Sequence, residues 1–306
     1  MTIESASRKL VAEFSSRRTL RTGSLITTVF GDAIAPRGGS VWLGSLIDVM
    51  SHFGISERLV RTSVFRLSQD GWLQSTQVGR RSYYMLSEDG SVRFAQATHK
   101  IYGEPGEAWD GTWNLVLLGQ LDSERRESVR KELGWLGYGA LASGVLAHPS
   151  PDMRDVDATL DRLDTAADLV IMTGHTIHNE QGMKALSRSS WNLADIDARY
   201  ASFVQRFRPL MAAYSRNSEV EPQAAFLVRT LLIQEYRKVL LRDPQLPDEL
   251  LPADWHGNAA YQLCRNLYRA VYSQADRYLS TTMETADGPL PPPGPSFFER
   301  FGGLEQ

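Results

Sequence analysis

The stretch that most constrains this chain's fold runs from residue 56 to residue 84, SERLVRTSVFRLSQDGWLQSTQVGRRSYY. Ser56 is a favourable N-cap, and Gly71 is a natural helix end. Between them, apolar or small residues recur at helical spacing on one face, namely Leu59, Val60, Ser63, Val64 and Leu67. Residues 72–78 and 82–86 then read as two strands joined by a turn at Gly79-Arg80-Arg81. The sequence therefore predicts a helix followed by a β-hairpin with arginines at its tip.

The opposite face of this helix carries groups suited to phosphates and base edges: Arg58, Arg61, Thr62, Phe65 and Arg66. Such a basic face also fits an ordinary solvated helix. The preceding segments favour DNA binding, because a helix over 24–34, a short strand at 40–42, a helix over 43–53 and a tight turn at Gly54 come first. This order of elements is that of a winged helix-turn-helix.

Three details of this interface leave alternatives open. Arg80 and Arg81 are predicted to grip phosphate or the minor groove from the hairpin. Phe65 either meets a thymine methyl group or turns toward the core. The cluster Arg17, Arg18 and Arg21 fits either an arm that touches phosphate or a solvated lead-in.

Charge is distributed unevenly along the 306 residues, whose net charge is −3. Residues 1–100 hold 13 Lys and Arg against 8 Asp and Glu, and the remainder holds 20 against 28. A basic first third on an acidic remainder fits one nucleic-acid-binding domain joined to something else. No apolar run reaches membrane-span length, and the first residues lack an apolar leader. Together with a single cysteine, Cys264, this leads us to expect a cytoplasmic protein without disulfides or a membrane partner.

The rest of the chain predicts an α+β multidomain protein. Residues 1–102 would form the winged domain, with Gly103-Glu104-Pro105-Gly106 as a linker. Residues 107–185 alternate strand and helix in the order of a ferredoxin-like α/β sandwich. Residues 190–283 predict a helical C-terminal domain, interrupted by a proline-rich loop. Residues 284–306, with five prolines, read as a flexible tail.

No specific catalytic or metal-binding pattern stands out. His175 and His178 lie three residues apart, without the HExxH context of a zinc helix. Asp254 and His256 flank a tryptophan, and Ser143 lacks the GxSxG turn. We therefore expect no metal, no cofactor and no catalytic residues, and a regulator rather than an enzyme. The alternative is an enzyme that acts on an acyl-CoA thioester or on nucleic acid through the central or C-terminal domain.

Three stretches resemble the PaaX family of bacterial repressors of phenylacetate-catabolism genes. They are the run from Ser24 to Leu73, the central WNLVLL and RESVRKELGWLGYGALASGVLAHP, and LRDPQLPDELLPADWHGNAAY after residue 240. The recognition-helix pattern VRTSVFRLSQDGWL also resembles that of GntR-type regulators. The resemblance implies a winged domain, a ferredoxin-like centre similar to a CRISPR-adaptation nuclease, and a helical domain. It also implies a homodimer that represses transcription and leaves double-stranded operator DNA when phenylacetyl-CoA binds.

An acyl-CoA effector would need aromatic packing together with Arg or Lys donors for its phosphates. The candidates that we name at the central–helical boundary are Arg242, Trp255, His256, Tyr261 and Arg265. Each of them also fits ordinary interdomain packing. The likeness to a nuclease does not extend to its chemistry, because the first central strand ends in Leu118-Gly119-Gln120-Leu121-Asp122 rather than in a cluster of carboxylates.

Overall fold

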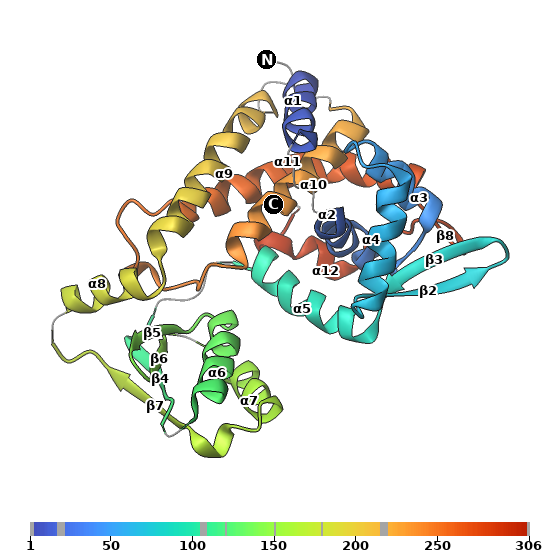
Figure 1. Ribbon diagram of the computed structural model, residues 1–306. Coiled ribbons are helices and arrows are strands. Elements are labelled where there is room, and N and C mark those ends of the chain that lie inside the picture. Colours follow the sequence, from blue (N-terminus) through green and yellow to red (C-terminus); the bar gives the residue numbers. More distant parts are fainter. Residues whose placement is uncertain are drawn as a thin grey trace. The chain divides into compact units, whose positions relative to one another are not determined.

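The computed structural model groups the chain into two compact units (Figure 1). It describes residues 3–16, 22–104, 109–119, 121–149, 151–178, 180–214 and 220–304. Unit 1 comprises residues 1–104, 203–238 and 259–306, and unit 2 comprises residues 105–202 and 239–258. The structure thus groups residues differently from the three predicted domains, because segments of the expected helical domain belong to both units.

Unit 1 begins with a helix that the polar opening of the sequence did not lead us to expect. Helix α1 (Ile3–Ser15) buries Ala6, Leu10 and Phe14, which recur every four residues on one face. Helix α2 (Thr22–Val29) continues into a π-helical turn, η1 (Phe30–Ile34), and a 3-10 turn, η2 (Ala35–Arg37). Gly38 ends this run with a φ of 79°, a conformation that glycine adopts without strain.

Three strands and two helices complete the N-terminal part of unit 1. Helix α4 (Glu57–Gln69) packs against α2 and against helix α3 (Leu43–Ser51). The three strands pair antiparallel in the order β1-β3-β2. Its strands are β1 (Ser40–Trp42), β2 (Leu73–Val78) and β3 (Arg81–Leu86). The β2–β3 hairpin turns at Gly79-Arg80, with Gly79 at a φ of 60°, and it projects from the helices (Figure 1).

The remaining helices of unit 1 bury the largest side chains. Helix α5 (Glu88–Tyr102) begins at Ser87, whose hydroxyl accepts from the backbone N–H of Gly90 at 2.9 Å. Most of α10 (Pro222–Leu240) and α11 (Gly257–Thr282), with the C-terminal part of α9 (Leu193–Tyr214), lies in this unit. Among the fully buried residues are Phe53, Phe207, Phe226, Tyr268 and Phe301.

The prediction of a flexible tail over 284–306 is wrong for the described residues 284–304. They form strands β8 (Glu284–Thr285) and β9 (Gly288–Pro289), helix α12 (Pro295–Phe298) and a 3-10 turn, η5 (Arg300–Gly302). Leu290, Phe297, Phe301 and Leu304 are each at most 4% exposed. The prolines restrict the unfolded backbone, and the apolar residues between them supply the buried surface that fixes the segment.

Unit 2 contains a four-stranded antiparallel sheet of the order β5-β6-β4-β7. Helices α6 and α7 alternate with its strands in the expected ferredoxin-like order. The elements are β4 (Thr112–Leu117), α6 (Ser123–Trp135), β5 (Gly139–Ala142), β6 (Val145–His148), α7 (Met153–Arg162), the 3-10 turn η3 (Ala166–Asp168) and β7 (Val170–His175).

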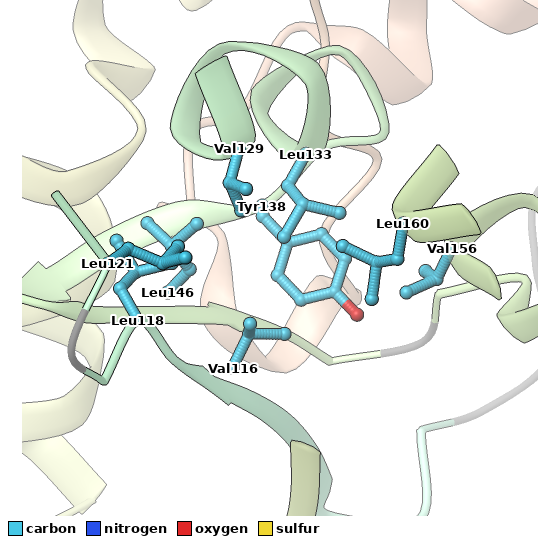
Figure 2. Packing of buried hydrophobic residues seen from close by; sticks show 9 residues of the cluster. All are labelled: Val116, Leu118, Leu121, Val129, Leu133, Tyr138, Leu146, Val156 and Leu160. Carbon is cyan, nitrogen blue, oxygen red and sulfur yellow. The ribbon is translucent and has the colours of Figure 1, made fainter. Parts of the chain in front are cut away.

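The two faces of this sheet have separate cores. Between the sheet and helices α6 and α7, Val116 and Leu146 pack on Val129, Leu133 and Leu160 around Tyr138 (Figure 2). On the other face, Trp113 stacks on Trp191 with 6.3 Å between ring centroids. This second core is completed by α8 (Glu180–Ser190), the first turns of α9 and a 3-10 turn, η4 (Asp248–Leu250).

Candidate nucleic-acid interface

Helix α4 divides cleanly into a buried stripe and an exposed face. Val60 and Val64 are at most 1% exposed, and α2 and α3 pack against this helix. The five side chains predicted to contact DNA are all exposed: Arg58, Arg61, Thr62, Phe65 and Arg66. The structure therefore brings the predicted residues of this helix together on one accessible surface, which we call the α4 face.

The two ends of α4 are set by local chemistry. Ser56 occupies the N-cap with extended backbone angles of −71° and 151°, although its hydroxyl makes no capping hydrogen bond to the described backbone. At the other end Gly71 has a φ of 73°, and the Trp72 N–H donates to the Leu67 carbonyl at 2.8 Å. This second contact turns the chain directly from the helix into the β2–β3 hairpin.

Arg61 makes a local ion pair on the α4 face. Its Nη2 lies 2.8 Å from Oε1 of Glu57, one helical turn earlier, and the two side chains are 57% and 60% exposed. Exposed pairs of this spacing contribute about 0.3–0.5 kcal/mol, so a phosphate or a base can replace the carboxylate at small cost. Thr62 donates its hydroxyl hydrogen to the Arg58 carbonyl at 2.9 Å and keeps its oxygen lone pairs as acceptors.

Helix α4 also exposes two large apolar side chains. Phe65 is 62% exposed, which resolves its predicted alternatives in favour of the outer surface. Leu59 is 48% exposed, so its predicted place on the core-facing side is wrong. The buried residues of α4 are Val60 and Val64, and Ser63, Leu67 and Ser68 are half-buried.

The two arginines of the hairpin occupy different environments. Arg80 lies in the turn and is exposed, as predicted. Arg81 is not at the tip, because it is the first residue of β3 and pairs with Val78. Its guanidinium lies 4.2 Å from the centre of the Trp42 ring, and its Nη1 lies 2.7 Å from Oε2 of Glu284.

These contacts hold the Arg81 side chain in place, and none of them involves Arg80. Hydrogen bonds to Tyr83 and Glu284 raise the pKa of the Arg81 guanidinium, which keeps its full charge. Within the described parts of the chain, the α4 face and the hairpin form ion pairs through Arg61 and Arg81, and not through Arg58, Arg66 or Arg80. Arg17, Arg18 and Arg21 lie outside the described residues.

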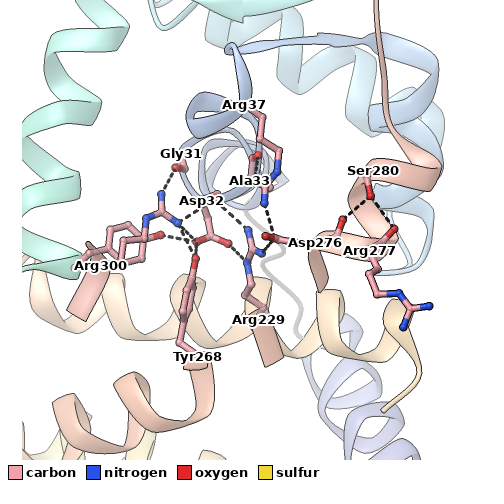
Figure 3. A network of polar contacts seen from close by, with 11 residues as sticks. Gly31, Asp32, Ala33, Arg37, Arg229, Tyr268, Asp276, Arg277, Ser280 and Arg300 are labelled. Atoms are coloured by element: carbon pink, nitrogen blue, oxygen red, sulfur yellow. Dashed lines mark hydrogen bonds and ion pairs between the residues drawn. The ribbon is translucent and has the colours of Figure 1, made fainter. Parts of the chain in front are cut away.

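Unit 1 also contains a buried charge cluster that sequence patterns did not indicate (Figure 3). Asp32, 2% exposed, accepts from Arg229 Nε at 2.7 Å and from Arg300 Nη1 at 3.0 Å. The hydroxyls of Tyr102 and Tyr268 donate to the same carboxylate at 2.7 and 2.8 Å. Burial raises the pKa of Asp32, but Arg229 and Arg300 outweigh it and hold that pKa below its ordinary value.

The charge cluster extends to a second carboxylate. Nη1 of Arg229 lies 2.6 Å from Oδ1 of Asp276, and Arg37 pairs with the same oxygen. Arg37 also donates to the Ala33 carbonyl at 2.7 Å. Three arginines and two aspartates therefore join η1, η2, α10, α11 and η5, with a net charge of +1 when all are ionised.

The residues named for an effector do not form one site within either unit. Arg242, Trp255 and His256 belong to unit 2, and Tyr261 and Arg265 belong to unit 1. Trp255 packs edge-on against Tyr200 at 5.7 Å. Nδ1 of His256 lies 3.0 Å from Oδ2 of Asp197. These contacts match the packing alternative for Trp255 and His256.

In the described ranges, no three His, Cys, Asp or Glu side chains gather so as to hold a metal ion. Asp122 accepts from the backbone N–H of Arg125 at 2.9 Å and caps α6. No described helix is long and apolar enough to cross a membrane.

Known proteins match this chain along most of its length. Three protein-family models match it. The family model described as PaaX-like protein matches residues 21–90, the one described as PaaX protein central Cas2-like domain matches residues 106–186, and the one described as PaaX-like protein C-terminal domain matches residues 191–281. The transcriptional repressor PaaX of Escherichia coli strain K12 is 41% identical over 284 residues, which cover 92% of this chain and 90% of that protein.

A solved structure shares the fold. The uncharacterized protein Rv0674 from Mycobacterium tuberculosis superposes with a TM-score of 0.52 at 23% identity. The match covers 76% of this chain and 89% of that one. At this identity the likeness concerns the fold alone.

Proposed function

The chain belongs to the PaaX family, and on that premise we propose that it is a DNA-binding transcriptional repressor whose residues 22–86 form a winged helix-turn-helix. Helix α4 is the recognition helix, and the β2–β3 hairpin is the wing. The element order α2, β1, α3, α4, β2, β3 and the sheet order β1-β3-β2 support this assignment. The related repressor of Escherichia coli supports the regulatory role over an enzymatic one.

The α4 face is the observation that carries the proposal. It presents Arg58, Arg61 and Arg66 beside a hydroxyl and an exposed aromatic ring, and the only ion pair described for these arginines is a weak surface pair. In the proposed complex Arg58, Arg61, Thr62, Phe65 and Arg66 enter the major groove. Arg80 contacts phosphate from the tip of the wing. Arg81 also contacts phosphate when its ion pair with Glu284 is broken.

We further propose that the repressor acts in the cytoplasm as a homodimer. Two recognition helices related by a two-fold axis would meet half-sites about 34 Å apart, one helical turn of DNA. Strand β7 supports self-association, because it is an edge strand of its sheet and exposes Val170 and Met172 at 54% and 46%. A second copy of β7 would cover both the free strand edge and these apolar side chains.

The proposed effector is an acyl-CoA, phenylacetyl-CoA, whose binding releases the repressor from operator DNA. This part of the proposal rests on the family and on the name of the related repressor. Release requires that the effector bind the DNA-free conformation more tightly than the DNA-bound one. The operator belongs to phenylacetate-catabolism genes in this proposal.

The deciding experiment is a binding titration of the full chain on DNA from upstream of its own gene, across a salt series, with and without phenylacetyl-CoA. Tight binding that weakens steeply with salt and disappears with the thioester supports repressor and effector together. Tight binding that ignores the thioester retains the repressor and removes the effector. Binding no stronger than to unrelated DNA, or turnover of the thioester or the DNA, contradicts the proposal and favours the enzyme alternative.

A further inference from the structure

Unit 1 contains a groove of about 690 Å³ that the predicted effector residues do not line. Its walls come from η1 and the loop after η2, from the end of β3, from one side of α5, and from α12 and η5. This volume lies within the range of small-ligand pockets. The groove runs beside the base of the proposed wing, because Met85 and Leu86 of β3 are part of its lining.

The lining combines aromatic surface with hydrogen-bond donors. Phe94 contributes a half-buried ring, Tyr102 and Phe297 contribute the edges of largely buried rings, and Thr98 and Ser296 contribute hydroxyls that can donate hydrogen bonds. Arg300 belongs to the buried charge cluster, whose net charge of +1 lies beneath this end of the groove. The carboxylate of Glu299 also lines the groove, but this residue is exposed to water.

Phe94 connects the groove to the proposed DNA-binding surface. Its ring packs edge-on against Trp72 with 5.7 Å between centroids, and it lies so close to Gly31 that a Cβ there would collide with it. Trp72 is the residue at which α4 turns into the wing. Its carbonyl accepts from the Ser87 N–H at 3.1 Å, at the start of α5. A group that displaces Phe94 therefore presses on the junction between the recognition helix and the wing.

We propose that this groove is the effector site, and that it takes a small ligand whose aromatic ring packs among Phe94, Tyr102 and Phe297 and whose carbonyl or carboxylate accepts a hydrogen bond. The proposal rests on the proposed function and deepens it, since it places the ligand within the same unit as the DNA-binding surface. Ligand binding moves Phe94 and Trp72, and the wing loses its position relative to α4.

Two ligand sources share this chemistry. An aryl-acyl thioester of coenzyme A would place its ring in the groove and direct its charged nucleotide toward solvent. A free aryl carboxylate would fit entirely inside. Phenylacetyl-CoA and phenylacetate are the two probes, with coenzyme A alone as the third.

The test fills the groove without touching the core or the DNA-binding residues. Ala95 lines the groove and is exposed, so an Ala95→Trp variant occupies the space and still folds. Val92→Trp is the matched control, because Val92 lies one turn earlier on α5, is 57% exposed and is not part of the lining. Ligand affinity is measured by calorimetry on the full chain, and DNA affinity is measured separately for all three proteins.

We expect Ala95→Trp to weaken binding of the probe by about tenfold or more. Val92→Trp should bind the probe as tightly as wild type does. If phenylacetyl-CoA binds and phenylacetate does not, the ligand is the thioester. If both bind, the groove recognises the ring and the carbonyl that the two probes share. Equal affinities in wild type and Ala95→Trp overturn the groove as the site while leaving the effector in place. Failure of wild type to bind any probe overturns both the effector and its site, and intact DNA binding in the same samples then preserves the repressor.

Discussion

Arg81 of the proposed wing forms an ion pair with Glu284 of the C-terminal hairpin, and its Nη1 lies 2.7 Å from Oε2 of Glu284. The two residues are 203 positions apart in the sequence. The same guanidinium stacks on Trp42, so one side chain is held by a carboxylate and by an aromatic ring. A phosphate near the wing has to compete with Glu284 for this arginine. In the proposed complex, Glu284 would therefore limit how much of the wing's charge is available to DNA.

Glu284→Gln should strengthen DNA binding a few-fold and make it more sensitive to salt. The amide still accepts a hydrogen bond, but it no longer neutralises Arg81. If the freed arginine contacts one more phosphate, the slope of log affinity against log salt becomes steeper by about 0.9. A salt series of DNA-binding titrations measures this slope.

The control for this variant is Asp287→Asn, which removes the same charge from the same hairpin. Asp287 is exposed, and its described hydrogen bond uses its backbone N–H rather than its carboxylate. Equal changes in both variants would mean that only the net charge of the hairpin matters. In that case the pairing of Arg81 with Glu284 would have no specific effect on DNA binding.

Asp32→Asn should destabilise unit 1 strongly. The aspartate is the only carboxylate described within hydrogen-bond distance of Arg300, and it also pairs with Arg229. Breaking a buried ion pair by removing one partner costs about 3–5 kcal/mol, because the remaining charge stays desolvated. Urea denaturation followed by circular dichroism measures the loss, with the exposed Asp48→Asn as a control expected to stay within about 0.5 kcal/mol of wild type.

The same carboxylate predicts how stability depends on pH. The pKa of Asp32 is lower in the folded protein than its ordinary value of 3.8. Its contribution is therefore complete above about pH 4 and is lost as the pH falls from there through the folded-state pKa. The difference in unfolding free energy between wild type and Asp32→Asn should shrink below pH 4. A difference that stays constant from pH 7 to pH 3 would contradict the role of this ionisation.

The local elements of this fold were predictable because their signals are local. The strands predicted over 72–78 and 82–86, with the turn predicted at Gly79-Arg80-Arg81, correspond to the hairpin that the structure contains as β2 and β3. The alternation of strands and helices over residues 107–185 predicted a ferredoxin-like sandwich, and the structure has the element order β4, α6, β5, β6, α7, β7 of that fold. Phe65 could be placed on the α4 face or in the core by its spacing alone, and only the packing of α2 and α3 decided for the surface.

The long-range features were not predictable from pattern. Asp32 lies 197 residues from Arg229 and 268 from Arg300, and no local pattern shows that these three charges meet. The C-terminal segment was mistaken for a tail because prolines outweighed its aromatic residues. A signal was present in Phe297-Phe298-Glu299-Arg300-Phe301, since three aromatic residues in five rarely stay in water.

Arg61→Ala should weaken binding to the operator by about 1–3 kcal/mol, with a smaller loss on unrelated DNA, if Arg61 contacts a base. The matched control is Arg199→Ala, because Arg199 pairs with Asp195 at the same helical spacing but lies in unit 2. Fluorescence anisotropy on both DNAs gives the two losses. Equal losses on operator and unrelated DNA would assign Arg61 to a phosphate instead.

Phe65→Ala tests whether the exposed ring on the α4 face contacts a thymine methyl group. Because the side chain is 62% exposed, its removal should change the unfolding free energy by less than about 0.5 kcal/mol. Operator affinity should nevertheless fall by about 1 kcal/mol, since an apolar contact with the methyl group is lost.

Replacing each operator thymine by uracil in turn removes one methyl group at a time. At one position the substitution should weaken wild type and leave Phe65→Ala unchanged. Trp135→Ala, which removes a 70% exposed ring from unit 2, should respond to every uracil as wild type does. Uracil substitutions that affect wild type and Phe65→Ala equally at all positions would show that the ring does not contact a thymine methyl group.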